Sequence, residues 1–486
     1  MPFGYTDSDC YREKPAGLPY SLIWLSLRGR CPQLEMKNLK SSTLLTRKIL
    51  LLAWPVILEM ALHMFVWVFD TAMVGRLNAG ALNAVGLGGQ IVFTITAVFA
   101  GVGIGALALV ARYCGAGQRG NMEMAASRAL GLSFIIGLLV AGAVGLLSRP
   151  VLQYFIKDPV VLEYGTAYMR ITSAAVVFMI PFSVSSYIMR GAGNTRTPMV
   201  IAAVANAINV IGDYVLIFGN FGFPRLEVTG AAIATATGQI TGSVIIIGLL
   251  IYGRAGIRVR LKNMFDMDRD FVKRILKLSI PASMEEFIHS GGRVISSLWI
   301  SSMGAIPFAA NSIAVAAESI SFMPGYGFAI AASTLVGHNL GASQRDEAEE
   351  SALKSTVMGT LFMTVIGLAF FFFPTLIIAI FTNLPDVMEL AARCIRIGAF
   401  EQPFIALSMV MAASLRGAGD TRGPLMVAVV SNWFIRLPLI YMVVYVWQLE
   451  VIYVWAATLI QFVAESGLLT LRFMKRRWKD IDLETI

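Results

Sequence analysis

The sequence RGAGNTRTP at residues 190–198 recurs as RGAGDTRGP at residues 416–424, an offset of 226 residues. Each copy stands between two long apolar runs. Its glycines permit a tight turn, its Asn or Asp can cap the following helix, and its Pro fits near a helix start, where a missing N–H does no harm. The motif lacks the Gly-Lys-Ser/Thr ending of a phosphate-binding loop. We therefore interpret it as a structural turn between helices rather than an ATP site.

Two further matches keep the same offset. GAGQR at residues 115–119 recurs as GASQR at residues 341–345, and WPVILE at residues 54–59 aligns with IPASME at residues 280–285. Similarity among apolar helices could produce one match by chance, but it does not easily produce three at one offset, including polar loops. The chain is therefore predicted to consist of two similar halves.

The composition indicates that lipid is the natural solvent of this chain. Of its 486 residues, 57% are hydrophobic and 14% are charged, with a mean hydropathy of +0.70, whereas a soluble domain carries roughly 25% charged residues. A helix needs about 20 apolar residues to cross the hydrocarbon core. Runs of this length, without the alternation of barrel strands, predict twelve transmembrane helices. The expected spans are 46–72, 84–112, 126–147, 164–189, 197–219, 229–252, 272–300, 309–335, 352–380, 389–415, 424–446 and 451–474.

Each half contains six predicted spans, so both halves insert in the same direction and are related by a pseudo-two-fold axis along the membrane normal. We predict an all-α integral membrane protein of two six-helix lobes. Rocking of such lobes around a cleft gives alternating access. A transporter is therefore favoured over a channel or an enzyme, since no selectivity-filter motif and no His-Glu-x-x-His motif is present. The expected segments are a basic N-terminal segment (1–45), an N-terminal lobe (46–253), an inter-lobe loop (254–271), a C-terminal lobe (272–474) and a tail (475–486).

Lysine and arginine indicate how the chain is oriented. They are concentrated in the loops that carry the repeated motifs, in the inter-lobe loop and in the C-terminal tail, and they are sparse in the opposite loops. Basic loops stay in the cytoplasm. Both termini are therefore expected there, in a multi-pass protein of a plasma membrane such as the bacterial inner membrane. The net charge of +9 is then a topology signal and not a sign of nucleic-acid binding.

The N-terminal segment, the cysteines and the histidines support weaker inferences. Residues 1–45 are expected to lie on the membrane surface or to be disordered, and Met36 is an alternative start of the native chain. The four cysteines and three histidines show no ligand spacing. Neither a disulfide nor a zinc centre is predicted from them.

The segment VFDTAMVGR at residues 68–76, together with the paired loops and the twelve spans, resembles the multidrug and toxic compound extrusion (MATE) family over roughly residues 45–478. The resemblance implies a secondary active antiporter that exports amphipathic, often cationic, organic compounds in exchange for protons or sodium ions. It implies no cofactor besides the coupling ion, and we expect a monomer in contact with membrane lipids. The alternative is a flippase for a lipid-linked precursor, which would need several cationic residues in the cleft.

Ionisable groups inside the spans are candidate functional residues, because a charge at the bilayer centre costs about 2.5–3.5 kcal/mol. Asp70 lies in the outer half of span one. Asn206, Asn209 and Asp213 lie on one face of span five, at positions i, i+3 and i+7. Asp70 and Asp213 could share a proton, or bind sodium together with Asn209. The MATE resemblance assigns these three residues to the proton or cation site, and Thr235 in span six is a further, weaker match.

A second group of polar residues lies nearer the middle of the membrane. Glu59 belongs to span one, Glu285 to span seven, and Glu401 and Gln402 to span ten. Each of them could contact the substrate or a second ion. Each could equally be paired with another buried polar group for structural reasons.

The departures from the repeat add two predictions. Leu439 replaces Asp213 in the second half, so only the N-terminal lobe is expected to carry the ion site. Arg436 in span eleven lies at a depth similar to that of Glu401, and we predict that these two residues form an intramembrane charge pair. Glu318 and Glu465 are the other possible partners of Arg436.

Overall fold

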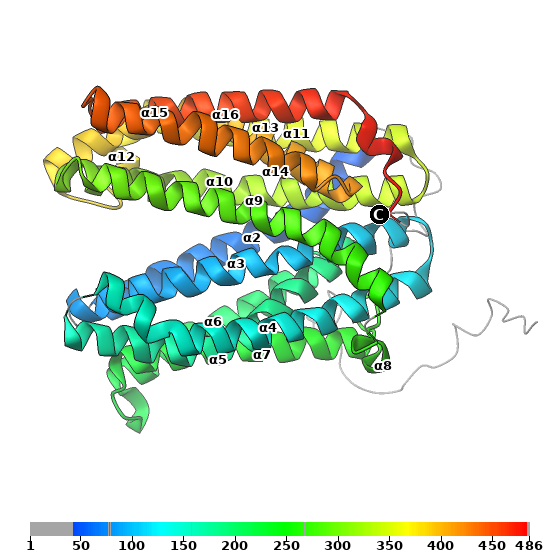
Figure 1. The fold of residues 1–486 in the computed structure, drawn as a ribbon, viewed down its shortest axis with the longest axis horizontal. Coiled ribbons are helices and arrows are strands. Elements are labelled where there is room, and N and C mark those ends of the chain that lie inside the picture. Colours follow the sequence, from blue (N-terminus) through cyan, green and yellow to red (C-terminus); the bar gives the residue numbers. More distant parts are fainter. Residues whose placement is uncertain (1–41, 76, 78, 157, 267, 484–486) are drawn as a thin grey trace, which may run out of the picture.

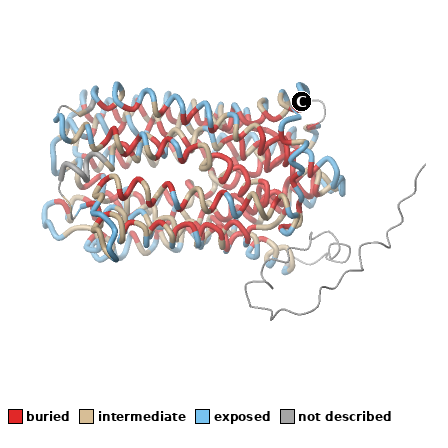
Figure 2. Tube along the Cα trace, turned by 90° about the horizontal axis from the view of Figure 1, so that it is seen from below, coloured by how far each residue is buried: buried red, intermediate tan, exposed pale blue. Residues whose placement is uncertain are grey.

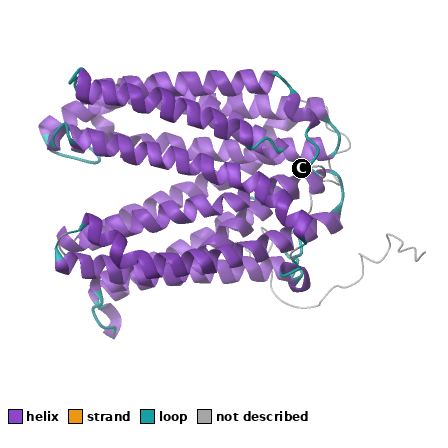
Figure 3. Cartoon of the chain, in the orientation of Figure 1, coloured by secondary structure: helices purple, strands orange, loops and turns teal. Residues whose placement is uncertain are grey.

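In a computed structural model, the regular elements of the described residues are all helices (Figures 1 and 3). The structure describes residues 42–483 except positions 76, 78, 157 and 267. Most of the predicted N-terminal segment, with the alternative start at Met36, lies outside the described residues.

The long helices correspond to the predicted spans. Their bounds are α2 (Ser42–Gly75), α3 (Ala79–Gly115), α4 (Arg119–Phe155), α5 (Pro159–Gly191), α6 (Arg196–Phe218), α7 (Glu227–Ile251), α9 (Arg269–Ser301), α10 (Ala305–Gly341), α11 (Arg345–Phe372), α13 (Pro385–Ala418), a composite helix of α14, η4, α15 and η5 (Arg422–Val446), and α16 (Val451–Met474). Short helical segments are η3 (Asn220–Gly222), α8 (Leu261–Met264), α12 (Pro374–Ile378) and η6 (Arg477–Asp480).

Two long helices depart from the simple prediction. Within the described residues, 11 helices are long and apolar enough to cross a membrane. Helix α9 is not among them, because Glu285, Glu286 and Arg293 add charge to its apolar half. The ninth expected span, 352–380, breaks at Phe373, because Pro374 starts the separate helix α12.

The internal repeat is visible in the helix boundaries. Helices α5 and α13 begin at Pro159 and Pro385, and helices α4 and α11 begin at Arg119 and Arg345, both at the offset of 226 residues. The packing repeats as well, because α5 contacts α3, α4 and α7 just as α13 contacts α10, α11 and α16. The prediction of an all-α fold of two six-helix lobes is confirmed.

The lobes contact each other mainly through four helices. Helix α2 packs against α10, and α3 packs against both α9 and α10. The approach is closest near the repeated loops, where Gly115 faces the backbone of His338 and Gly341 faces the backbone of Arg112, with no room for a Cβ at either glycine. We call this end of the molecule the basic end, defined by the loops at residues 112–119, 190–196, 341–345 and 416–422.

The two lobes diverge away from the basic end. Figure 1 shows the two groups of helices close together at the end that carries the C-terminus and apart at the other end. Figure 2 shows that buried residues are most continuous toward the same C-terminal end. The arrangement is therefore closed at the basic end, and the helices splay toward the opposite end.

Candidate functional site

The structure brings together the polar residues that were predicted for the N-terminal lobe. Asp70 lies near the end of α2 and Asp213 near the end of α6, on the side away from the basic end. The two carboxyl groups are within hydrogen-bonding range of each other. Asn209 Nδ2 donates to Asp213 Oδ2 at 3.1 Å and to Thr235 Oγ1 at 3.5 Å. Asn206, three residues before Asn209 on α6, is buried, and its Nδ2 has no hydrogen-bond partner.

This carboxyl pair has the chemistry of a site for one proton or one monovalent cation. Two ionised carboxylates in contact repel each other in a medium of low dielectric constant, so a shared proton or a bound cation is needed to hold them together. Asp70 Oδ1 and Asp213 Oδ1 are both buried without a hydrogen-bond partner. No group of three or more His, Cys, Asp and Glu side chains in the described part of the chain could hold a metal ion. A sodium ion would therefore need amide or hydroxyl oxygens besides the two carboxylates.

Tyr168 on α5 is a site residue that the sequence did not reveal. Its side chain is buried and lies close to Thr235, Asp70 and Asp213. A hydroxyl next to two carboxyl groups can donate to the ionised form or supply a ligand oxygen to a cation. The sequence contains 14 tyrosines, and nothing in the repeat distinguishes this one.

The corresponding positions of the C-terminal lobe do not form such a site. At an offset of 226 residues, the two aspartates and Asn209 are replaced by Ser296, Leu439 and Ile435. The geometry thus supports the expectation that the carboxyl pair belongs to one lobe only.

Glu59 and Glu285 instead form buried ion pairs with the repeated arginines. Arg190 Nη2 lies 2.7 Å from Glu59 Oε1, and Arg416 Nη1 lies 2.6 Å from Glu285 Oε1. The two pairs are related by the repeat. This geometry supports the structural alternative for both glutamates over contact with a substrate or a second ion. As loop residues the arginines indicate only topology, but the shared offset of the Glu and Arg motifs also points to this pairing.

Polar contacts also join the lobes near the basic end. The hydroxyl groups of Tyr187 and Tyr326 are 2.6 Å apart, and His338 Nε2 lies 2.7 Å from the carbonyl oxygen of Gly191. The guanidinium of Arg190 lies over the ring of Tyr187, 5.4 Å from its centroid. The ion pair in the N-terminal lobe is therefore adjacent to a contact that must break if the lobes separate at this end.

Arg436 and Glu401 form no direct ion pair, although they lie close enough for their charges to interact. Both carboxylate oxygens of Glu401 are buried without a hydrogen-bond partner, and so is Arg436 Nε. The composite helix has wide π-type turns at Val430–Arg436. Such turns change the direction of the following side chains, which counting residues along a regular helix does not capture. Arg436 still belongs to the charged groups that surround Glu401, together with Glu318.

Other buried polar side chains of the C-terminal lobe form hydrogen bonds with one another. Gln402 Nε2 donates to Glu318 Oε1 at 3.2 Å. Glu465 Oε2 accepts hydrogen bonds from Ser431 at 2.7 Å and from Gln461 at 2.5 Å. The geometry thus explains Gln402 and Glu465 as partners in polar contacts between helices, whereas Glu401 is left with an unpaired carboxyl group.

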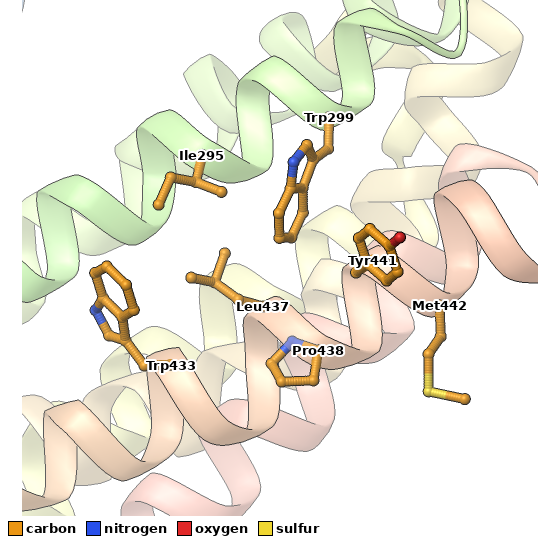
Figure 4. A pocket seen from close by; sticks show the side chains of 7 residues that line it. All are labelled: Ile295, Trp299, Trp433, Leu437, Pro438, Tyr441 and Met442. Atoms are coloured by element: carbon orange, nitrogen blue, oxygen red, sulfur yellow. The ribbon is translucent and has the colours of Figure 1, made fainter.

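A cavity of about 440 Å³ lies between α9 and the composite helix (Figure 4). Its lining residues are aromatic or aliphatic: Ile295, Trp299, Trp433, Leu437, Pro438, Tyr441 and Met442. Trp299 and Tyr441 contact each other edge to face, with ring centroids 5.7 Å apart. Such a surface suits an aromatic ring or an alkyl chain, and its aromatic faces also attract organic cations.

The two-lobed helical fold, the buried carboxyl pair in one lobe and the apolar cavity in the other define a multi-pass membrane transporter. A sequence profile of the MatE family matches residues 55–215 and 281–442, one match in each lobe at the offset of the repeat. The chain belongs to the MatE family. The resemblance seen in the sequence is confirmed, and because the members of this family are transporters, the protein is not an enzyme.

Relatives with similar length support the same assignment. The "Probable multidrug resistance protein NorM" of Thermotoga maritima is 30% identical over 434 residues, which cover 89% of this chain and 93% of that protein. The "Uncharacterized transporter YisQ" of Bacillus subtilis is 27% identical, with coverage of 88% and 93%.

Solved structures share the fold. A structure described as the outward-facing conformation of a multidrug resistance MATE family transporter of the MOP superfamily has a TM-score of 0.84 and 19% identity, and covers 96% of this chain and 100% of its own. A MOP superfamily transporter from Pyrococcus furiosus, described as having a binding pocket of reverse polarity, has a TM-score of 0.83 and 20% identity, with the same coverage.

Proposed function

We propose that this protein is a secondary active antiporter that exports amphipathic, often cationic, organic compounds in exchange for protons or sodium ions. The observation that carries the proposal is the contact between the carboxyl groups of Asp70 and Asp213, each with one buried oxygen that has no partner. A relative named as a multidrug resistance protein, 30% identical over 89% of this chain, supports the class of substrate.

The coupling follows from the energetics of the carboxyl pair. Without a proton or cation, the two carboxylates repel each other, and the contact between α2 and α6 is weakened. With the ion bound, the contact is stabilised. An ion that binds one arrangement of the helices more tightly shifts the equilibrium between lobe arrangements by that difference in affinity, and a substrate that favours the other arrangement is thereby coupled to the ion.

The orientation of the protein in the membrane is part of the proposal. The excess of lysine and arginine at the basic end supports a cytoplasmic location of that end and of both termini. The arrangement that is closed at the basic end then faces outward, and the carboxyl pair lies in the outer half of the membrane. We propose a multi-pass location in the plasma membrane; a monomeric state stays a prediction.

The substrate class is supported by the cavity beside α9. Its lining contains Trp299, Trp433 and Tyr441 and no charged residue. Such a lining binds the apolar part of an amphipath through burial and can attract its cationic group through ring faces.

Transport assays in proteoliposomes test the proposal. A fluorescent organic cation is followed while a sodium gradient or a proton gradient is imposed separately. We expect one gradient to drive transport and the variants Asp70→Asn and Asp213→Asn to abolish it. Glu286→Gln, which removes a partly exposed carboxylate on α9, is the matched control and should transport normally. Gradient-driven transport by either aspartate variant would refute the assigned coupling site.

The alternative is a flippase for a lipid-linked precursor, and Arg436 is the observation that favours it. Its Nε is buried inside the C-terminal lobe without a hydrogen-bond partner, so it could bind an anionic headgroup. The other buried arginines of the spans are less suited, since Arg190 and Arg416 are paired with glutamates. Transport of a labelled lipid-linked precursor, with no effect of either gradient on the organic cation, would favour this alternative.

A further inference from the structure

A second pocket lies at the basic end of the C-terminal lobe, far in sequence from the carboxyl pair. Its volume is about 220 Å³, and its lining residues come from the α13–α14 loop, the end of α16 and the tail: Asp420, Arg472, Lys475, Arg477, Trp478 and Ile481. Most of its lining side chains are charged, in contrast to the apolar cavity beside α9.

The charges around this pocket do not cancel. Arg472 is neutralised by Asp420, to which it donates two hydrogen bonds of 2.7 and 3.0 Å. Lys475 and Arg477 are exposed, and neither forms an ion pair with a described residue. The pocket therefore carries two uncompensated positive charges beside a fixed Arg–Asp pair, which makes it suitable for an anion.

The tail that forms one wall of the pocket is firmly packed. Trp478 is buried, its ring stacks on Phe473 at a centroid distance of 4.8 Å, and its Nε1 donates to the carbonyl oxygen of Phe473 at 2.9 Å. The carbonyl oxygen of Ile481 accepts a hydrogen bond of 2.6 Å from Arg112 on α3. The pocket is thus held in shape by contacts to both lobes.

The neighbouring surface is apolar and exposed. Leu471 and Met474, in the last turn of α16, are 60% and 69% exposed. They lead directly to Lys475, the first residue after α16. The cytoplasmic surface of a membrane is rich in anionic lipids, and basic residues beside a helix end attract their headgroups. In the first half, Leu249 and Ile251 stand at the positions that correspond to Lys475 and Arg477.

We propose that this pocket binds the phosphate group of an anionic phospholipid, with Lys475 and Arg477 in contact with the headgroup. Arginine can hold two phosphate oxygens at once, and lysine supplies a point charge. The acyl chains then lie along the exposed apolar side chains at the end of α16. A lipid accounts for both the positive pocket and this apolar surface, whereas a free phosphate ion would use only the pocket.

Native mass spectrometry of the full-length protein in detergent tests the proposal. The protein is titrated with phosphatidylglycerol, and the number and affinity of retained lipids are compared with those for phosphatidylcholine. Removal of both charges in the double variant Lys475→Gln/Arg477→Gln should weaken phosphatidylglycerol binding about 30-fold, because each basic residue near an anionic surface contributes about 1 kcal/mol, or about 5-fold. The charge-preserving variant Lys475→Arg/Arg477→Lys should retain binding within a few fold.

The matched control is Lys262→Gln/Arg269→Gln. It removes two exposed positive charges that lie near the basic end of the molecule but outside the pocket. Equal loss of lipid in this control would overturn the proposal, since it would indicate diffuse attraction by net charge. Equal affinity for phosphatidylcholine would also overturn it. Displacement of phosphatidylglycerol by an equal concentration of inorganic phosphate would identify a free-phosphate site instead of a lipid site.

Discussion

Replacing Glu285 by Gln should destabilise the protein by about 3 kcal/mol, whereas replacing the adjacent Glu286 by Gln should cost less than about 1 kcal/mol. The side chain of Glu285 is 8% exposed and lies 2.6 Å from Arg416, which is 17% exposed. Breaking a buried pair from one side costs about 3–5 kcal/mol because the other charge is left uncompensated. We take the lower end because Arg416 retains some access to solvent.

The neighbouring residue provides the matched control for this prediction. Glu286 lies 3.4 Å from Arg293, with side chains that are 41% and 55% exposed. Pairs that are this exposed contribute about 0–1 kcal/mol. The two substituted residues are adjacent in the sequence and undergo the same chemical change. They differ in how deeply their side chains are buried.

Denaturant titration in mixed micelles measures the free energies of unfolding of the two variants. These free energies can be compared when the slope of free energy against denaturant concentration is the same for both variants. The double variant Glu285→Gln/Arg416→Met should recover most of the loss, because a neutral, apolar replacement of the whole pair removes the buried charge. Equal costs for the two single glutamate variants would refute the reasoning. So would a double variant whose cost is the sum of its two single costs.

The remaining predictions concern the carboxyl pair and the closed end. If the coupling ion is a proton, binding of an organic cation to the protein in weakly buffered detergent solution should release up to one proton. The Asp213→Asn variant should release none, and pH-stat titration measures the number of protons released. Tyr168→Phe should weaken binding of the coupling ion about 5-fold, or about 1 kcal/mol, because one hydrogen bond is lost. The thermal stability of this variant should stay close to that of the parent protein. Isothermal titration with the ion measures the affinity, and an unchanged affinity would exclude Tyr168 from the site. Gly341→Ala should prevent full closure at the basic end, since a Cβ there would overlap the backbone of Arg112. A cysteine introduced at Ser279, a buried position of α9 that contacts Val102 of α3, should be labelled faster in this variant, and unchanged labelling would contradict the prediction.

The repeat allowed much of the fold to be predicted. Twelve apolar runs and one constant offset were sufficient for the helices, the two lobes and their parallel relation, because membrane helices must satisfy their own backbone hydrogen bonds and each span is therefore a local feature. The aspartates were found for the same reason, since charge inside an apolar run is costly. Asn209 followed from its spacing to Asp213 on a single helix.

Residues whose role depends on contacts between helices were not predictable in this way. Tyr168 contacts Thr235 across two helices, and tyrosine in a membrane span carries no cost that would single it out. Arg190 was assigned to a loop by its sequence position, whereas its side chain reaches Glu59 inside the lobe. Depth alone predicts a pair between Arg436 and Glu401, and a count along a regular helix does not include the wide turns at Val430–Arg436.

The two halves of the repeat separate structural features from functional ones. Features present in both halves at the same offset, such as the pairs Glu59–Arg190 and Glu285–Arg416, stabilise the packing within each lobe. Features present in one half only are not part of the packing that the two lobes share. Asp70 and Asp213 in the first lobe, the aromatic cavity beside α9 and the cationic pocket below α16 belong to this second group. Substitutions at paired positions should therefore lower stability in either lobe, whereas substitutions at unpaired positions should alter ion coupling, substrate binding or lipid binding while the protein stays folded.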